Sequence, residues 1–204
     1  MRWHSKRATR AGGLRRAGRA GPSQAILGAV NTDDTPILRR ATAADGAAYI
    51  ELVRGLARFE ELEPPDDAAA ARLLAHAFGP RPRYELDVVE LGGELVAYAV
   101  YFETYSTFRA LPSLYLEDLF VREDARGRGI GGSILRRLAR LAWERGCGRF
   151  EWSVLDWNES AQSFYRSLGA RIMSDWQLCR LDGAALASLA QSSPGGLTSA
   201  DGGA

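Results

Sequence analysis

Residues 114–133, LYLEDLFVREDARGRGIGGS, constrain the fold more than any other part of the chain. An apolar stretch with two adjacent carboxylates runs into a polar turn, and a glycine-rich loop then opens a segment of helical periodicity. N–H groups at a helix start lack partners within the helix, and the helix dipole is positive there. Glycines also let a ligand approach the main chain closely. This segment therefore predicts a strand, loop and helix that together bind phosphate.

The helix predicted for residues 130–145 has one apolar face. Its isoleucine, leucines and alanine recur at helical spacing, while the charged side chains lie largely elsewhere on the wheel. Packing this face on a sheet fixes the loop that starts at Arg126 beside the C-terminal end of the preceding strand. A glycine-rich connector without a ligand is the alternative.

The chain has 204 residues, enough for one domain with tails. Residues 1–36 carry seven basic side chains against two aspartates and no hydrophobic period, so we expect a disordered extension. Residues 37–183 hold 19 basic and 22 acidic residues, a net charge of −3 that suits a cationic small molecule. Residues 184–204 are rich in Ser, Gly and Ala, and we expect a flexible tail.

Several classes of protein are disfavoured by composition. No stretch approaches the roughly 20 apolar residues of a membrane span, and no signal-peptide run follows Met1, so we expect a cytoplasmic protein without a membrane partner. Cys147 and Cys179 lack paired spacing, and His4 and His76 are the only histidines, so no metal site is expected. The basic leader could be a nucleic-acid arm, a transit peptide or a silent extension; we expect no nucleic-acid partner.

The remaining periodicities and breakers predict the order of elements. A capping box at Thr42 and Asp45 starts a helix that reaches about residue 61. Strands are expected at 37–40, 84–91, 94–104, 114–121, 149–154, 170–173 and 177–181, and further helices at 66–78, 130–145 and 159–168. This order predicts an α+β, three-layer fold with a mixed, mostly antiparallel sheet of six to seven strands and about four helices.

A dinucleotide fold is the rival interpretation of the glycine loop. Gly127, Gly129 and Gly132 match G-x-G-x-x-G, and Glu151 follows about twenty residues later. We reject it because five residues separate the strand from the first glycine and the chain lacks repeated βαβ units. The pattern Arg126-x-x-Gly129-x-Gly131 explains more of the segment.

That pattern resembles the acyl-CoA-binding motif of the GCN5-related N-acetyltransferase (GNAT) superfamily, over about residues 37–181. LYLEDLFV, RGRGIG and WNESAQSFYRSLGA more narrowly resemble the spermidine/spermine (diamine) and thialysine N-acetyltransferases. The resemblance implies the GNAT fold with a splayed fourth and fifth strand. It also implies an acyltransferase that moves the acetyl group of acetyl-CoA to a primary amine of a small cationic acceptor, a diamine, polyamine or thialysine-like amino acid. A homodimer with C-terminal strands crossing the interface is implied as well.

The resemblance also assigns residues to the two ligands. It implies that acetyl-CoA contacts the end of the fourth strand, the glycine loop and the start of the last helix: Leu119, Phe120, Val121, Arg126, Gly127, Arg128, Gly129, Ile130, Gly131, Gly132, Asn158, Ser160 and Ala161. It implies that the acceptor contacts Phe59, Glu60, Asp118, Glu151, Trp152 and Ser153. Residues 106–108, Ser-Thr-Phe, lack an acidic residue that would strengthen a polyamine assignment.

The predicted catalytic residues are Glu117 and Tyr165. Removing the proton of an amine with a pKa near 10.4 costs about 4 to 5 kcal/mol at neutral pH, so a base is useful. A carboxylate on an apolar strand could have a raised pKa, which favours Glu117 as base, directly or through water. By alternation Asp118 points to the other side. By resemblance, Tyr165 supplies a proton to the departing sulfur.

Blander interpretations stay open for these residues. Glu117 could be a solvated strand residue, Tyr165 a core aromatic and Glu60 an ordinary exposed helix residue. The two cysteines lack a credible base, so direct attack in a ternary complex is preferred to a covalent route. A non-catalytic acyl-CoA sensor and acetylation of protein lysines are the alternative functions.

Overall fold

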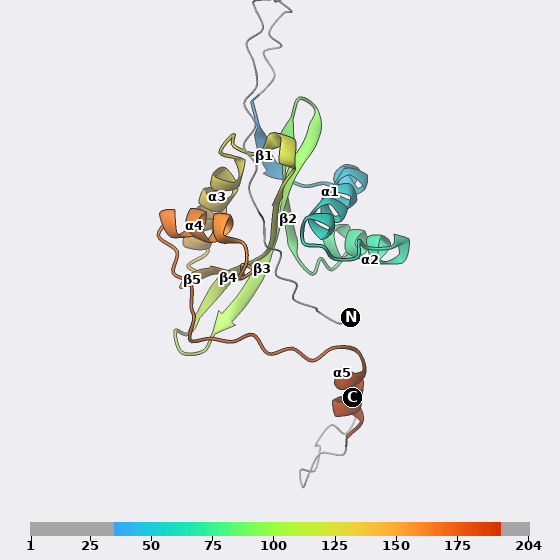
Figure 1. Ribbon diagram of the computed structural model, residues 1–204, viewed down its shortest axis with the longest axis vertical. Helices are drawn as coiled ribbons and strands as arrows, with labels where there is room; N and C mark the ends of the chain where they lie inside the picture. Colours follow the sequence, from blue (N-terminus) through green and yellow to red (C-terminus); the bar gives the residue numbers. More distant parts are fainter. Residues whose placement is uncertain (1–34, 193–204) are drawn as a thin grey trace, which may run out of the picture.

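The computed structural model describes residues 35–192 and contains one five-stranded sheet in the order β1-β2-β3-β4-β5 (Figure 1). The four antiparallel strands come first, and β5 pairs parallel to β4. Their bounds are β1 Ile37–Arg40, β2 Glu85–Leu91, β3 Glu94–Ser106, β4 Leu111–Val121 and β5 Arg149–Trp152. The mixed, mostly antiparallel sheet predicted from the sequence is confirmed.

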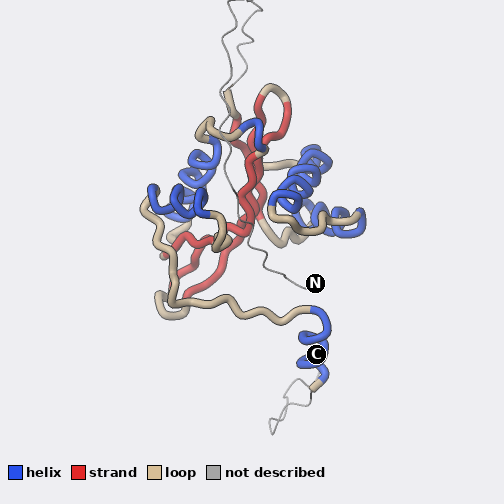
Figure 2. The backbone as a smooth tube through the Cα atoms, in the orientation of Figure 1, coloured by secondary structure: helices blue, strands red, loops and turns tan. Residues whose placement is uncertain are grey.

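Helices cover both faces of this sheet, which gives three layers (Figure 2). One face carries α1 Gly46–Phe59 and α2 Asp67–Phe78, and the other carries α3 Ile130–Glu144 and α4 Glu159–Ser167. Two 3₁₀ turns, Ala43–Asp45 and Glu123–Ala125, precede α1 and the glycine loop. Each face has its own buried cluster, because the two-sided burial of the central strands needs an apolar partner layer on each side.

The predicted starts of the first two helices are present. The Asp45 carboxylate accepts hydrogen bonds from the Thr42 amide at 2.7 Å and the Thr42 hydroxyl at 3.0 Å. Asp66 caps α2, because its carboxylate accepts from the amide of Ala69 at 2.7 Å. The Asp66 side chain supplies an acceptor to a first-turn amide of α2, and the Asp45 carboxylate holds the turn that leads into α1, so both helices start where the sequence predicts.

An ion pair with a buried aspartate fixes α3 on the sheet. Arg137 on α3 donates through Nε to Asp87 on β2 at 2.5 Å, and Asp87 is only 1% exposed. The Tyr101 hydroxyl donates to the same carboxylate at 3.1 Å. Because a buried carboxylate needs such partners, this contact sets the position of α3 and of the loop at its N-terminus.

A β-bulge in β4 changes which side chains face which layer. Val100 pairs with Asp118 and Tyr101 pairs with Leu116, so Glu117 is the extra residue. Before the bulge, Leu116 packs in the cluster beneath α3; after it, Phe120 packs in the cluster beneath α1. Asp118 therefore shares the α1 face of the sheet.

The fourth strand and the edge strand β5 separate after a short paired stretch, as the resemblance implies. β4 and β5 are paired over four positions, which end at Leu116 and Trp152. At this end of the paired stretch, the hydroxyls of Tyr115 and Ser153 hydrogen-bond at 3.0 Å. The rest of β4, residues 117–121, has no partner on the β5 side, so the two strands diverge as a wedge.

The prediction of two strands in the C-terminal part is wrong. Within residues 35–192 no strand forms at 170–173 or 177–181, so the sheet has five strands rather than six or seven. A strand needs an adjacent edge, and this segment runs away from the sheet with every residue from 171 to 192 exposed (Figures 1 and 2). A helix, α5 Gly183–Gln191, occupies part of the expected loose tail. Residues 1–34 and 193–204 lie outside the described part.

Candidate active site

The glycine loop presents open main chain at the start of α3. Gly127 and Gly129 have φ angles of 78° and 75°, a region that favours glycine, and a Cβ added at either position would meet no atom within 4 Å. The bond from the Ser133 amide to the Gly129 carbonyl, at 3.0 Å, begins the helical pattern. The amides before it point out of the helix start, so this loop has the space and the donors for a diphosphate.

Arg126, the first member of the predicted loop set, is already engaged within the protein through both its amide and its side chain. The Arg126 amide donates to the Glu123 carbonyl at 3.2 Å. The Arg126 side chain turns toward the sheet, where Nε donates to the Val121 carbonyl at 3.0 Å. Its guanidinium carbon lies 4.9 Å from the ring centre of Phe59 and 6.0 Å from that of Phe120. Sequence reasoning placed this charge on the diphosphate, whereas here it joins α1 to β4.

The opposite wall is formed by the start of α4. Asn158 is its N-cap, because Oδ1 accepts from the Ala161 amide at 3.1 Å. Within residues 35–192 the Nδ2 group has no hydrogen-bond partner, which leaves a donor for a ligand. Gln162 holds the preceding loop through Nε2 bonds to the Leu155 and Asp156 carbonyls, at 3.2 and 3.0 Å. Sequence reasoning missed Gln162, since only the folded loop shows its two acceptors.

Tyr165 lies two turns after Asn158 and is half-buried. Its ring packs edge-on against Trp152 at 5.3 Å, at the end of the β4–β5 pairing. Burial raises the pKa of the Tyr165 phenol above its usual value. The phenol is therefore protonated at neutral pH, as a proton donor must be.

Asp118, on the α1 face of the sheet, interacts electrostatically with two other carboxylates, Glu117 and Glu60. Burial, together with the charges of Glu117 and Glu60, raises the pKa of Asp118 to about 6. Glu60, which follows the last residue of α1, also has a pKa raised by burial. The raised pKa thus belongs to Asp118, the carboxyl that the resemblance assigned to acceptor binding.

A buried hydroxyl faces this acidic group. Tyr98 on β3 is fully buried, and its hydroxyl makes no hydrogen bond within the described part of the chain. The Asp118 carboxyl lies close enough that the Tyr98 hydroxyl favours its ionised form.

The remaining predicted acceptor residues are divided between two places. Phe59 ends α1, and its ring centre lies 6.0 Å from that of Trp157. On β5, Glu151 forms an ion pair with Arg149 at 3.3 Å, a contact within its own strand. The structure therefore brings Glu60, Glu117 and Asp118 together, and places Trp152 against Tyr165, while Glu151 is occupied by its strand neighbour.

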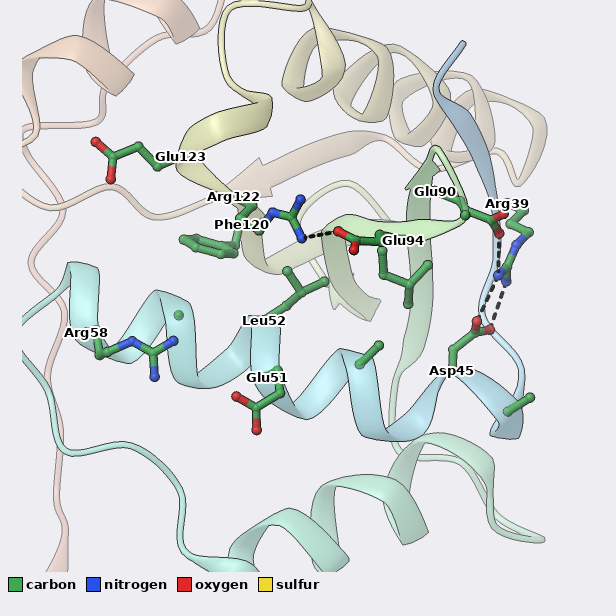
Figure 3. Close-up of a pocket in the computed structure, with 15 residues that line it drawn as sticks. Arg39, Asp45, Glu51, Leu52, Arg58, Glu90, Glu94, Phe120, Arg122 and Glu123 are labelled. Carbon is green, nitrogen blue, oxygen red and sulfur yellow. Dashed lines mark hydrogen bonds and ion pairs between the residues drawn. The ribbon is translucent and has the colours of Figure 1, made fainter. Parts of the chain in front are cut away.

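A groove of about 760 Å³ adjoins the α1 side of this region (Figure 3). It lies between α1, the β2–β3 turn and the end of β4, and Phe120 lies in its wall. A Cβ added at Gly55 would stand 3.0 Å from the Phe120 ring, so the glycine lets α1 approach β4. The ion pair of Arg122 with Glu94, at 3.0 Å, closes part of the groove. A glycine inside a helical pattern, as at Gly55, is the sequence feature that could have indicated the close approach of α1 to β4.

Other chemistries find little support among residues 35–192. No group of three His, Cys, Asp or Glu side chains that could hold a metal ion is found there. Burial raises the pKa of the Cys147 thiol, which disfavours a reactive thiolate, and Cys179 is exposed. No helix in the same part is long and apolar enough to cross a membrane.

Comparison with known proteins agrees with this architecture. Residues 50–170 match the model of the acetyltransferase (GNAT) family. A thialysine N-epsilon-acetyltransferase from Sus scrofa is 33% identical over 165 residues, which cover 76% of this chain and 96% of that protein. An L-ornithine N5-acetyltransferase from Arabidopsis thaliana is 42% identical over 100 residues, covering 49% of this chain and 42% of that protein.

A solved structure supports the fold independently. An integron cassette protein from V. cholerae superposes with a TM-score of 0.69 at 24% identity, covering 77% of this chain and 98% of that one. The splayed strands, the open glycine loop and the matched residues thus lead to one conclusion. The chain is an acyltransferase that belongs to the GNAT acetyltransferase family, with relatives in the thialysine and spermidine/spermine group.

Proposed function

We propose that this enzyme transfers the acetyl group of acetyl-CoA to a primary amine of a small cationic acceptor, a diamine, polyamine or thialysine-like amino acid. The observation that carries the proposal is the electrostatic interaction of Asp118 on β4 with Glu117 beside it and with Glu60, which follows α1. A partly buried acidic wall attracts an ammonium group and disfavours anionic acceptors. Relatives named for thialysine and for ornithine support an acceptor of this class.

The residues that would hold acetyl-CoA lie along the wedge and the loop. The diphosphate would take the amides of residues 127–132, and main-chain groups of Leu119 and Val121 would bind the pantetheine arm as an added strand does. Asn158 would donate from the opposite wall, with Ser160 and Ala161 beside it. When bound, acetyl-CoA supplies an acetyl thioester that an amine can attack.

Two side chains would move the protons. Glu117, the extra residue of the bulge, would accept the amine proton directly or through water, while Asp118 and Glu60 hold the cationic acceptor. The amine nitrogen forms a bond to the acetyl carbon, the carbon–sulfur bond breaks, and Tyr165 gives its proton to the departing sulfur. The raised pKa of Tyr165 supports this role, because the phenol holds its proton until that step.

We also propose a homodimer. Large apolar side chains on the C-terminal segment are exposed, with Trp176 at 75% and Leu178 at 81%. Exposed apolar surface of this kind on a segment that leaves its own sheet is typical of contact with another subunit. The C-terminal segment would then lie against a second copy of the chain.

The function is tested by incubating the full chain with acetyl-CoA and a panel of free amines while released thiol is measured. We expect turnover with a short diamine, a polyamine or thialysine, and a large loss in Glu117→Gln and Tyr165→Phe. Glu151→Gln is the matched control, since this carboxylate is paired within its strand and its loss should have a smaller effect. Failure of every amine to release thiol would overturn the proposal.

A further inference from the structure

One aromatic ring joins three segments of the site. Phe59 is the last residue of α1 and is 42% exposed. Its ring contacts Arg126, which opens the glycine loop, and Trp157, which directly precedes the Asn158 cap of α4. The glycine loop and the segment before α4 therefore both contact the end of α1, where Glu60 follows Phe59.

The Arg126 side chain is committed to this junction. Its guanidinium lies near two rings, 4.9 Å from the centre of Phe59 and 6.0 Å from that of Phe120, while Nε bonds the Val121 carbonyl at 3.0 Å. Among residues 35–192 it forms no ion pair. A planar guanidinium can contact a ring face and donate in its own plane at once, which an ammonium cannot.

We propose that Arg126 acts on the cofactor as a positioning residue through Phe59, and not as a ligand of the diphosphate. The Phe59–Arg126 contact joins the start of the glycine loop to the end of α1. This inference rests on the proposed function, since it concerns how the acetyl-CoA loop is held. One consequence is that binding at the loop and binding at Glu60 influence each other, because both depend on the same contact.

A double-mutant cycle on CoA affinity tests the inference and does not require the amine to be known. The Kd of CoA is measured by calorimetry for the full chain, for Phe59→Leu, for Arg126→Gln and for the double variant. The loss of an exposed cation–π contact of about 1 kcal/mol predicts that Phe59→Leu raises the Kd about fivefold. Arg126→Gln removes the same contact and also the bond to Val121, so it should raise the Kd at least as much. Adding Phe59→Leu to Arg126→Gln should then change the Kd no further.

A direct phosphate ligand would behave differently. If Arg126 touched the diphosphate, Arg126→Gln would raise the Kd by the same factor in the wild type and in Phe59→Leu. The effects of the two changes on the Kd would then multiply. That result would overturn the inference. Arg128→Gln is the matched comparison on the same loop, and its effect should multiply with that of Phe59→Leu.

Two further variants separate positioning from general damage. Phe59→Tyr keeps the ring, so this variant should bind CoA like the wild type. In the Phe59→Tyr background, Arg126→Gln should raise the Kd as much as it does in the wild type. Phe108→Leu removes a fully exposed ring at the β3–β4 turn and should leave the Kd unchanged. Thermal unfolding verifies that each variant is folded. Absence of CoA binding by the wild type would overturn the proposed function itself, whereas wild-type binding with multiplying effects would overturn only the role of Arg126.

Discussion

Replacing Asp118 by asparagine should make the protein more stable and less active. The carboxyl has its pKa raised from 3.8 to about 6, chiefly by burial and then by the charges of Glu117 and Glu60. A rise of this size corresponds to roughly 3 kcal/mol against the ionised form in the folded state. The contribution of the protonated Asp118 carboxyl to the free energy of unfolding is fully present below about pH 4 and is lost as the pH rises through 6. An amide of the same shape avoids that loss.

The difference is measured by urea unfolding of the wild type and Asp118→Asn at pH 8 and at pH 4. We expect the free energy of unfolding of the variant to exceed that of the wild type by up to roughly 3 kcal/mol at pH 8, and the two to converge at pH 4. Amine acetylation by the variant should fall sharply. Glu117→Gln, at an exposed position, is the control and should raise stability less than Asp118→Asn does, because the Glu117 charge is a smaller cause of the raised Asp118 pKa than burial. A variant that is no more stable at pH 8, or equally stabilised at both pH values, would refute the reasoning.

Three further outcomes are expected. Tyr165→Phe should lower kcat about a hundredfold with little change in the KM for acetyl-CoA, since the lost group acts only as a proton donor; steady-state kinetics decide this. Gly129→Ala forces a side chain into the left-handed region and should weaken CoA binding about tenfold by calorimetry. Gly146→Ala, at the far end of α3 with a φ of 68°, should leave that affinity unchanged. Trp176→Asp should convert a dimer to a monomer in light scattering, and an unchanged mass would contradict the proposed interface.

Local sequence signals were sufficient for most elements of the fold. Helix starts followed from Asp45 and Asp66, and the β2–β3 hairpin from two adjacent glycines, because caps and turns depend on a few neighbouring residues. The β4 bulge was not predictable in the same way. A strand buried on both faces has no clean alternation, so the sequence does not reveal that Glu117 is the extra residue and that Asp118 faces α1.

Long-range contacts account for the other differences. The alternation in residues 177–181 predicts a strand, yet a strand forms only beside a free edge, and this segment leaves the sheet. Arg126 and Phe59 are far apart in the chain, so no local pattern indicates that the arginine turns from the loop toward α1. The strand, glycine loop and helix form where the sequence predicts them, while the direction of the first side chain of the loop required the fold.

The most direct test of the account is to follow the acetyl group itself. The enzyme is incubated with acetyl-CoA that carries an isotopic label in the acetyl group, and with the amine that releases most thiol, and all products are analysed by mass spectrometry. We predict that labelled N-acetylated amine accumulates in equal amount to free CoA. Labelled free acetate in its place, or label retained on a side chain of the protein, would contradict direct transfer to a small amine.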